Sequence, residues 1–456
     1  MISYIILICL ITFLLILSFF LFRRDYLSPS FLSCGMFDIC AILAVIGKNS
    51  WNNEIKLSIN TIAIIILGLS AFILGEFLLK RYMQNKPKAD KVSQLNVIKV
   101  STLKYVLLFT FVITTVLLVY FEIRRICIHY DFTSRWLPDM LNFYRQKSIL
   151  YDNILMRDGT DINFIVKQMQ KFCSIICCFG IFIFINNFFA HDKRRNYVKL
   201  LALIILCFLA SLLSSGRAIL MQYFIFSVFL FMYYYKSYSK KKNYKKMIIY
   251  LALFFVFITS VFYFIAPLVG RGTRNNIVNY VSFYFGTSIP SLNRFVVNIP
   301  KHDKYIGNET FSGVYESLNR YNVINYERDS AYGWQMFGEQ GSNIYTSFRS
   351  YYFDFGIIGI LVFPFIFGFL INWFYKKAKR NYFWLIIYSY YSYIFIEQIR
   401  AEQFFRLLSS TTVSYVLYFA MVYIFLFYLT KERYLDIKKE GIKSALLMKI
   451  TPIEEM

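Results

Sequence analysis

The sequence predicts an all-α, polytopic integral membrane protein that crosses a bilayer about eleven times. Of its 456 residues, 58% are hydrophobic and 20% aromatic, while only 17% are charged. Apolar runs approach the length of about 20 residues that a helix needs to span a bilayer, and they recur along the whole chain. Basic residues gather in alternate connections between these runs, as expected from the positive-inside rule. This composition excludes a single soluble core.

The apolar runs divide the chain into membrane and loop regions. The predicted helices cover residues 2–22, 31–47, 58–79, 103–121, 172–190, 198–213, 217–235, 247–268, 354–375, 381–397 and 410–430. They form N-terminal (1–121), central (172–268) and C-terminal (348–430) membrane regions, separated by a first external loop (122–171) and a large external loop (269–347), with a cytoplasmic tail at 431–456. The first run lacks a basic leader and a small-residue cleavage site, so it is interpreted as a retained span.

The basic residues predict the orientation of the chain. The net charge is +24, and the predicted inner segments hold 29 of the 50 Lys and Arg residues, 22 of them Lys and 7 Arg. This distribution places the N-terminus outside and the C-terminus in the cytoplasm. Because the Lys clusters lie between membrane spans, no nucleic-acid partner is expected.

In the predicted outer segments Arg outnumbers Lys, with 14 Arg and 7 Lys, whereas Lys outnumbers Arg in the inner segments. Arginine binds phosphate or carboxylate through a planar fork, which lysine lacks. The excess therefore favours an anionic ligand on the outside. Alternatively, these arginines pair with acids of the loops themselves, among them Glu316, Glu327, Asp329 and Glu339.

Both external loops have the mixed composition of a folded surface. The aromatic stretch 280–285 predicts amphipathic helices lying on the outer leaflet. The eight cysteines lie mostly in apolar runs and are interpreted as small core residues, not as a disulfide or metal framework. No phosphate-binding Gly-Lys-Ser/Thr loop or paired histidine motif is present, so neither a metal nor a cofactor is expected.

Arginines at the predicted outer boundary are candidates for anion binding. Arg217 follows Ser214-Ser215-Gly216 in a tight break between two predicted spans, and Arg271 and Arg274 follow the eighth span. A charge at this depth needs a partner, and together the three arginines are candidates to bind a diphosphate. The alternative is an anchor to lipid headgroups.

Two further polar clusters lie near the last spans. Arg349 and Asp354 lie where the large loop enters the ninth span, and Asp354 is either a helix-start acid or a catalytic carboxylate. Glu397 and Arg400 lie in a polar turn before the last span and either bind substrate or pair with one another. His302 in the large loop is either a general base or an exposed spectator.

In this region the chain resembles the Wzy-type polymerases, which polymerise oligosaccharide repeat units into O-antigen or capsule. The resemblance covers about residues 198–410 and rests on five segments, Ser214–Arg217, Tyr280–Phe295, Phe311-Ser312-Gly313, Asn343–Thr346 and Asp354–Gly359. The arginine-to-glycine spacing of some O-antigen polymerases is not clearly present. The loop arginines are therefore not carried over as a unit.

The resemblance implies a metal-independent glycosyl transfer at the outer face of the bacterial plasma (inner) membrane, in an architecture similar to the GT-C-like lipid-dependent glycosyltransferases. The substrate would be an oligosaccharide on undecaprenyl diphosphate, and a chain-length regulator and a flippase would be possible partners. Arg217, Arg271, Arg274 and Arg349 would bind the diphosphate, with Glu397 and Arg400 nearby. Asp354 would be the first candidate for the base, and Glu339 and His302 the alternatives.

Three other functions remain open at this point. An O-antigen ligase has the same span count and outer loop but a different acceptor. A flippase or transporter would place its charges near the middle of the membrane, and a scaffold would need no arginine at the outer boundary.

Overall fold

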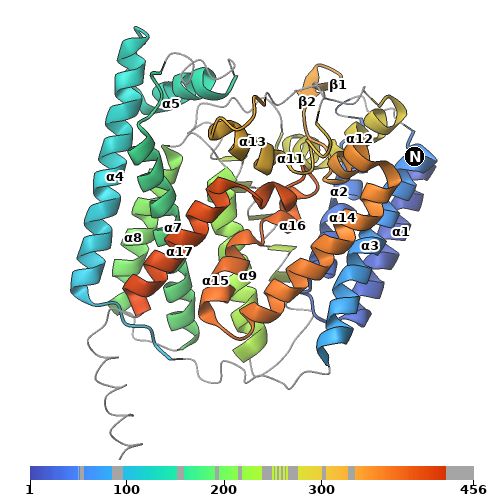
Figure 1. Cartoon of the computed structure of the whole chain (residues 1–456), viewed down its shortest axis with the longest axis horizontal. Coiled ribbons are helices and arrows are strands. Elements are labelled where there is room, and N and C mark those ends of the chain that lie inside the picture. Colours follow the sequence, from blue (N-terminus) through green and yellow to red (C-terminus); the bar gives the residue numbers. More distant parts are fainter. Residues whose placement is uncertain are drawn as a thin grey trace, which may run out of the picture.

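The protein is a bundle of helices with short elements gathered at one end (Figure 1). The computed structural model describes residues 1–49, 51, 56–84, 96–150, 159–190, 195–213, 218–238, 276–299, 305–326 and 334–427, with scattered residues between 249 and 264. The predicted tail, 431–456, and most of the predicted span 247–268 lie outside the described residues.

Eight described helices are long and apolar enough to cross a membrane: α1 (Ile2–Leu21), α2 (Pro29–Ile46), α3 (Ile59–Gln84), α4 (Thr102–His129), α7 (Phe164–Phe189), α9 (Ala218–Tyr238), α14 (Phe348–Ala378) and α17 (Ser410–Phe427). A shorter apolar helix, α8 (Arg195–Leu212), lies between α7 and α9 in the sequence. They follow the predicted spans in order. The prediction of a mainly helical membrane protein is confirmed in this form, while the count of eleven spans stays a prediction.

The predicted span 381–397 is not one continuous helix. It forms α15 (Tyr382–Tyr391) and the short α16 (Ile394–Glu397), separated by a turn at Ser392 and Tyr393. At 1.5 Å per residue, α15 is about 15 Å long, roughly half the thickness of the hydrocarbon core. The sequence is apolar enough for a span, but the helix ends after 10 residues.

The short elements lie at the end of the bundle that also carries the N-terminus (Figure 1). They are α5 (Leu137–Arg145), the π-helical turn Gln146–Leu150, α11 (Ile277–Gly286), α12 (Ser288–Val297), α13 (Ser312–Arg320) and the strands β1 (Gln335–Phe337) and β2 (Gln340–Ser342). The two strands form an antiparallel hairpin in which Met336 pairs with Gly341. A 3₁₀ turn, Phe405–Leu407, precedes α17.

The aromatic stretch 280–285 lies in α11, and its place on the outer leaflet stays a prediction. The next helix, α12, is buried inside the bundle. Ile289 and Leu292 are fully buried, and the Asn293 side chain accepts hydrogen bonds from the Ser58 amide at 2.7 Å and the Thr61 hydroxyl at 2.9 Å. This part of the large loop therefore belongs to the packed core, and it contacts the start of α3.

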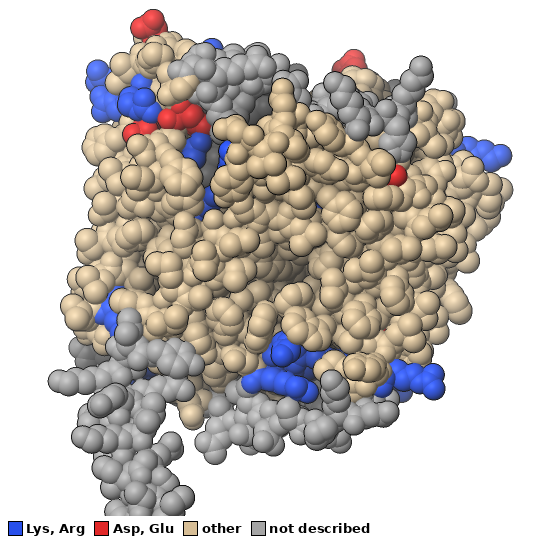
Figure 2. Space-filling model, in the orientation of Figure 1, with Lys and Arg blue, Asp and Glu red and all other residues tan. Residues whose placement is uncertain are grey.

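The opposite end of the bundle carries a basic surface, shown in blue at the bottom of Figure 2. There Asp25 forms ion pairs with Lys236 of α9 and, at 3.4 Å, with Lys379 at the end of α14. The Tyr375 hydroxyl donates a hydrogen bond of 3.0 Å to the same carboxylate. Both ends of the bundle are thus fixed by polar contacts, and the lysines lie on the face that the charge pattern predicts to be inner.

Candidate functional site

A polar cavity of about 300 Å³ lies between α13, the break between α15 and α16, and the start of α17. Its lining residues come from segments far apart in the sequence. They are Gln222, Gly313, Glu316, Ser317, Arg320, Tyr390, Tyr391, Tyr393, Gln403, Arg406, Leu407, Ser409, Thr411, Thr412 and Tyr415. The cavity therefore forms only when the large loop packs on the α15–α16 break and α17.

Two arginines and one acid give the cavity its charge. The Arg406 Nη2 atom lies 3.3 Å from Glu316 Oε1 on α13. Arg320, at the end of α13, donates to the hydroxyls of Ser410 at 3.3 Å and Thr411 at 3.4 Å. Because Ser410 and Thr411 begin α17, these positive charges lie beside a helix N-terminus, where the helix dipole also favours an anion.

The position of α13 is set by close backbone packing. A Cβ atom at Gly313 would lie only 2.1 Å from the carbonyl oxygen of Arg406, so no other residue fits here without a shift. One turn further on, the Ser317 hydroxyl accepts the Ser410 amide hydrogen at 3.0 Å. These contacts hold Glu316 and Arg320 against the turn that carries Arg406.

The break in the predicted tenth span supplies the aromatic wall of the cavity. Tyr390, Tyr391 and Tyr393 line it from the α15–α16 break, and Tyr415 lines it from α17. The Tyr390 and Tyr415 rings lie 5.8 Å apart, and the Gln222 side-chain amide donates to the Tyr390 carbonyl at 3.3 Å. Interrupted membrane helices commonly line binding cavities in this way.

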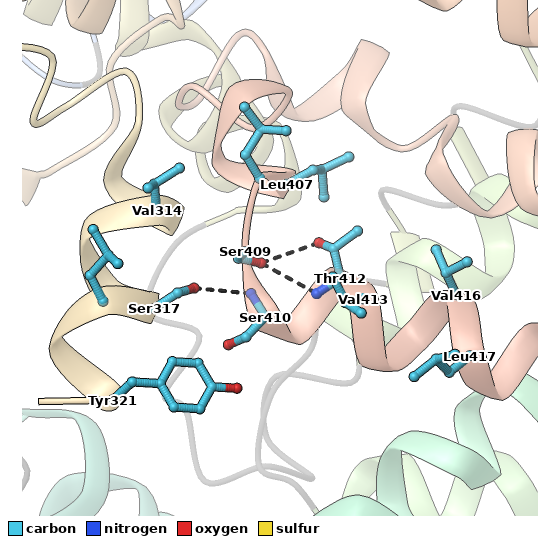
Figure 3. Close-up of a pocket in the computed structure, with 12 residues that line it drawn as sticks. Val314, Ser317, Tyr321, Leu407, Ser409, Ser410, Thr412, Val413, Val416 and Leu417 are labelled. Carbon is cyan, nitrogen blue, oxygen red and sulfur yellow. Dashed lines mark hydrogen bonds between the residues drawn. The ribbon is translucent and has the colours of Figure 1, made fainter. Parts of the chain in front are cut away.

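An apolar groove of about 670 Å³ adjoins the polar cavity (Figure 3). The two share Ser317, Leu407, Ser409 and Thr412. The remaining lining residues of the groove are Val314, Leu318, Tyr321, Leu408, Ser410, Val413, Val416 and Leu417. The site therefore combines a charged compartment with an apolar one and suits an amphipathic ligand.

Asp354 and Arg349 lie outside this cavity and hold the large loop to α14. The Asp354 carboxylate, only 8% exposed, accepts the Thr310 amide hydrogen at 2.6 Å and that of Glu309 at 3.4 Å. Arg349 forms an ion pair of 2.5 Å with Glu309 and stacks on the Tyr345 ring. Asp354 is the seventh residue of α14, so its carboxylate caps the loop segment and not the start of its own helix.

The remaining predicted residues do not join the cavity either. Glu397 and Arg400 form an ion pair of 2.8 Å with each other, as one of the two interpretations expected. Glu339 is exposed in the turn between β1 and β2. His302, Arg217, Arg271 and Arg274 lie outside the described residues, so their roles stay predictions.

Neither Arg320 nor Arg406 was named as a candidate from the sequence. The signal that could have found both is the arginine excess of the predicted outer segments. That count includes Arg320 and Arg406 but does not say where they lie in the fold. Seven of the eight cysteines are buried, as expected of small core residues, and Cys9 is exposed. In the part of the chain that the structure describes, no group of three or more His, Cys, Asp or Glu residues is arranged to hold a metal ion.

Comparisons with known proteins leave the site to be interpreted from its own geometry. No family model matches the chain, and no curated protein or solved structure matches it.

Proposed function

We propose that the protein is a membrane glycosyltransferase that polymerises oligosaccharide repeat units carried on undecaprenyl diphosphate. The reaction would take place at the outer face of a bacterial plasma membrane and build O-antigen or capsule. The observation that supports this most is the cavity with Arg320 and Arg406 that continues into an apolar groove. The resemblance of residues 198–410 to Wzy-type polymerases agrees with it.

The polar compartment suits the diphosphate of such a substrate. Arg406 and Arg320 offer planar donors, and the first turn of α17 adds the positive end of a helix dipole. The leaving group gains negative charge as the glycosidic bond to phosphate breaks. Arginine donors placed beside the leaving diphosphate stabilise that charge.

The groove suits the isoprenoid chain. Its wall on α17 includes Val413 and Leu417, which are 60% and 58% exposed in the protein, and Leu408 before the helix is 55% exposed. Exposed apolar side chains on a membrane helix face lipid, so a chain can enter from the bilayer while its diphosphate stays in the cavity. Burial of each methylene contributes about 0.8 kcal/mol relative to water.

The chemistry requires one carboxylate near the reacting sugars. A hydroxyl oxygen of the acceptor sugar attacks the anomeric carbon of the donor, the bond from that carbon to the phosphate oxygen breaks, and undecaprenyl diphosphate leaves. Glu316, the acid among the described lining residues, takes the hydroxyl proton. The tyrosines of the wall offer ring faces to the sugars.

A ligase would use the same cavity with a different acceptor, and a flippase would use it without chemistry. Purified protein in lipid vesicles, supplied with lipid-linked repeat units, distinguishes the three. A polymerase produces a ladder of longer lipid-linked chains and releases one undecaprenyl diphosphate for each bond formed. Repeat units that cross the vesicle membrane without lengthening would contradict the proposal, as would transfer only to a different acceptor.

A further inference from the structure

We infer that Glu402 is a positioning residue that fixes the direction in which Arg406 enters the cavity. This inference rests on the proposed function, because it concerns the arginine assigned there to the diphosphate. Glu402 itself does not line the cavity, whereas Gln403 and Arg406, which follow it, do.

Glu402 is a buried carboxylate that organises its own turn. It is 5% exposed, and its oxygens accept the amide hydrogens of Phe405 at 2.7 Å and Arg406 at 2.9 Å. These two residues open the 3₁₀ turn, whose amides have no earlier turn to bond to. The carboxylate therefore satisfies the donors at the start of the turn and fixes the backbone from which the Arg406 side chain leaves.

A third hydrogen bond connects the Glu402 carboxylate to the helix bundle. The Tyr351 hydroxyl of α14 donates to Glu402 Oε1 at 3.1 Å. Tyr351 is 1% exposed, stacks on Phe363 at 5.6 Å between ring centroids, and meets the edge of Phe405 at 5.9 Å. A rigid aromatic cluster thus holds Glu402, which in turn holds the Arg406 backbone.

Only a carboxylate matches this donor set. Three donors converge on its two oxygens, and above the pKa of Glu402, about 7, the ionised carboxylate accepts at both. In Glu402→Gln one oxygen becomes an NH₂ group, which faces a backbone N–H and cannot accept from it. The variant keeps the side-chain volume but loses a hydrogen bond that fixes the 3₁₀ turn. The Arg406 side chain should therefore adopt more orientations.

The test measures binding of farnesyl diphosphate to the full-length protein in detergent, for the wild type, Arg406→Ala, Glu402→Gln and the double variant. We expect each single variant to bind about tenfold more weakly, because a hydrogen bond to a charged group is disturbed in both. If Glu402 acts through Arg406, the double variant binds no more weakly than Arg406→Ala. Glu122→Gln is the matched control, since the Glu122 carboxylate also accepts a backbone amide, that of Asn163, at 3.3 Å.

The outcomes separate the two proposals. Absence of binding by the wild type overturns the proposed function and this inference with it. The positioning role alone is overturned if Arg406→Ala weakens binding but Glu402→Gln does not. It is also overturned if the losses of affinity in the two single variants add in the double variant. If Glu402→Gln fails to fold, Tyr351→Phe replaces it, and its loss must likewise vanish in the Arg406→Ala background.

Discussion

The guanidinium of Arg406 lies 3.3 Å from the carboxylate of Glu316, which is 90 residues earlier in the chain. Both side chains are more than a third exposed, at 38% and 37%. An ion pair with this exposure stabilises the fold by no more than about 1 kcal/mol. The pair is therefore weak enough for a diphosphate to displace, and Arg406 is available to a ligand.

Arg406→Lys should lower polymerisation although it keeps the positive charge, because lysine lacks the planar fork that binds two phosphate oxygens. We expect a loss of about tenfold in the rate of bond formation, measured with lipid-linked repeat units in vesicles. Arg125→Lys is the control, since Arg125 pairs with Glu122 at 2.8 Å away from the cavity. Equal activity of the two variants would remove Arg406 from the site.

Asp354→Asn should lower the stability of the protein together with its activity. Asparagine offers one acceptor oxygen where the carboxylate now accepts two backbone amides, and loss of such a buried bond costs about 1–3 kcal/mol. The measurement is the thermal midpoint in detergent, with the exposed Asp139→Asn as control. Unchanged stability combined with lost activity would instead return Asp354 to the catalytic role that the resemblance implies.

Gly356→Ala should destabilise α14, because Gly356 breaks the helix at φ 59° and ψ −145°, a conformation that residues with a Cβ rarely adopt. The expected cost is about 1–3 kcal/mol. Gly35→Ala in α2 is the matched control, since its new Cβ would lie 3.8 Å from Leu15, an ordinary contact, and alanine favours the helix. A Gly356→Ala thermal midpoint at or above that of the wild type would contradict the strained geometry.

The pH dependence of stability should include a contribution from Glu402. Burial raises the pKa of this carboxyl from 4.5 to about 7. Between these values the unfolded chain has lost the proton that the folded protein still holds, so the free energy of unfolding falls as the pH rises through this window. The groups that face the carboxyl are the hydroxyls of Tyr351 and Tyr393 and the backbone amides of Phe405 and Arg406.

Glu402→Gln removes that titration. The thermal midpoint of the variant should therefore decrease less than that of the wild type between about pH 4.5 and pH 7. Parallel curves for the two proteins would show that Glu402 does not carry the raised pKa.

Much of the bundle could be predicted, because the apolar composition of a short segment is enough to indicate a membrane helix. The runs at 2–22, 58–79 and 410–430 each correspond to one helix, within a few residues. The run at 381–397 could not be predicted correctly. Its composition is that of a span, while the break at Ser392 is stabilised by distant partners such as Gln222 on α9.

The candidate site depended on tertiary contacts that no local pattern contains. Arg320 and Arg406 line one cavity because α13 packs on the 3₁₀ turn through Gly313. The sequence placed an arginine excess on the outer side but gave no means of choosing among those residues. Asp354 was chosen for its place at a helix start, whereas its carboxylate binds the backbone of the large loop.

The central proposal, polymerisation at this cavity, is tested most directly by the lipid-linked oligosaccharides of a strain that lacks this gene. We predict single, unpolymerised repeat units on the lipid carrier, with long chains restored by the wild-type gene but not by Arg406→Ala. Long polymer that accumulates on the carrier in the deletion strain would contradict the account and identify a ligase instead.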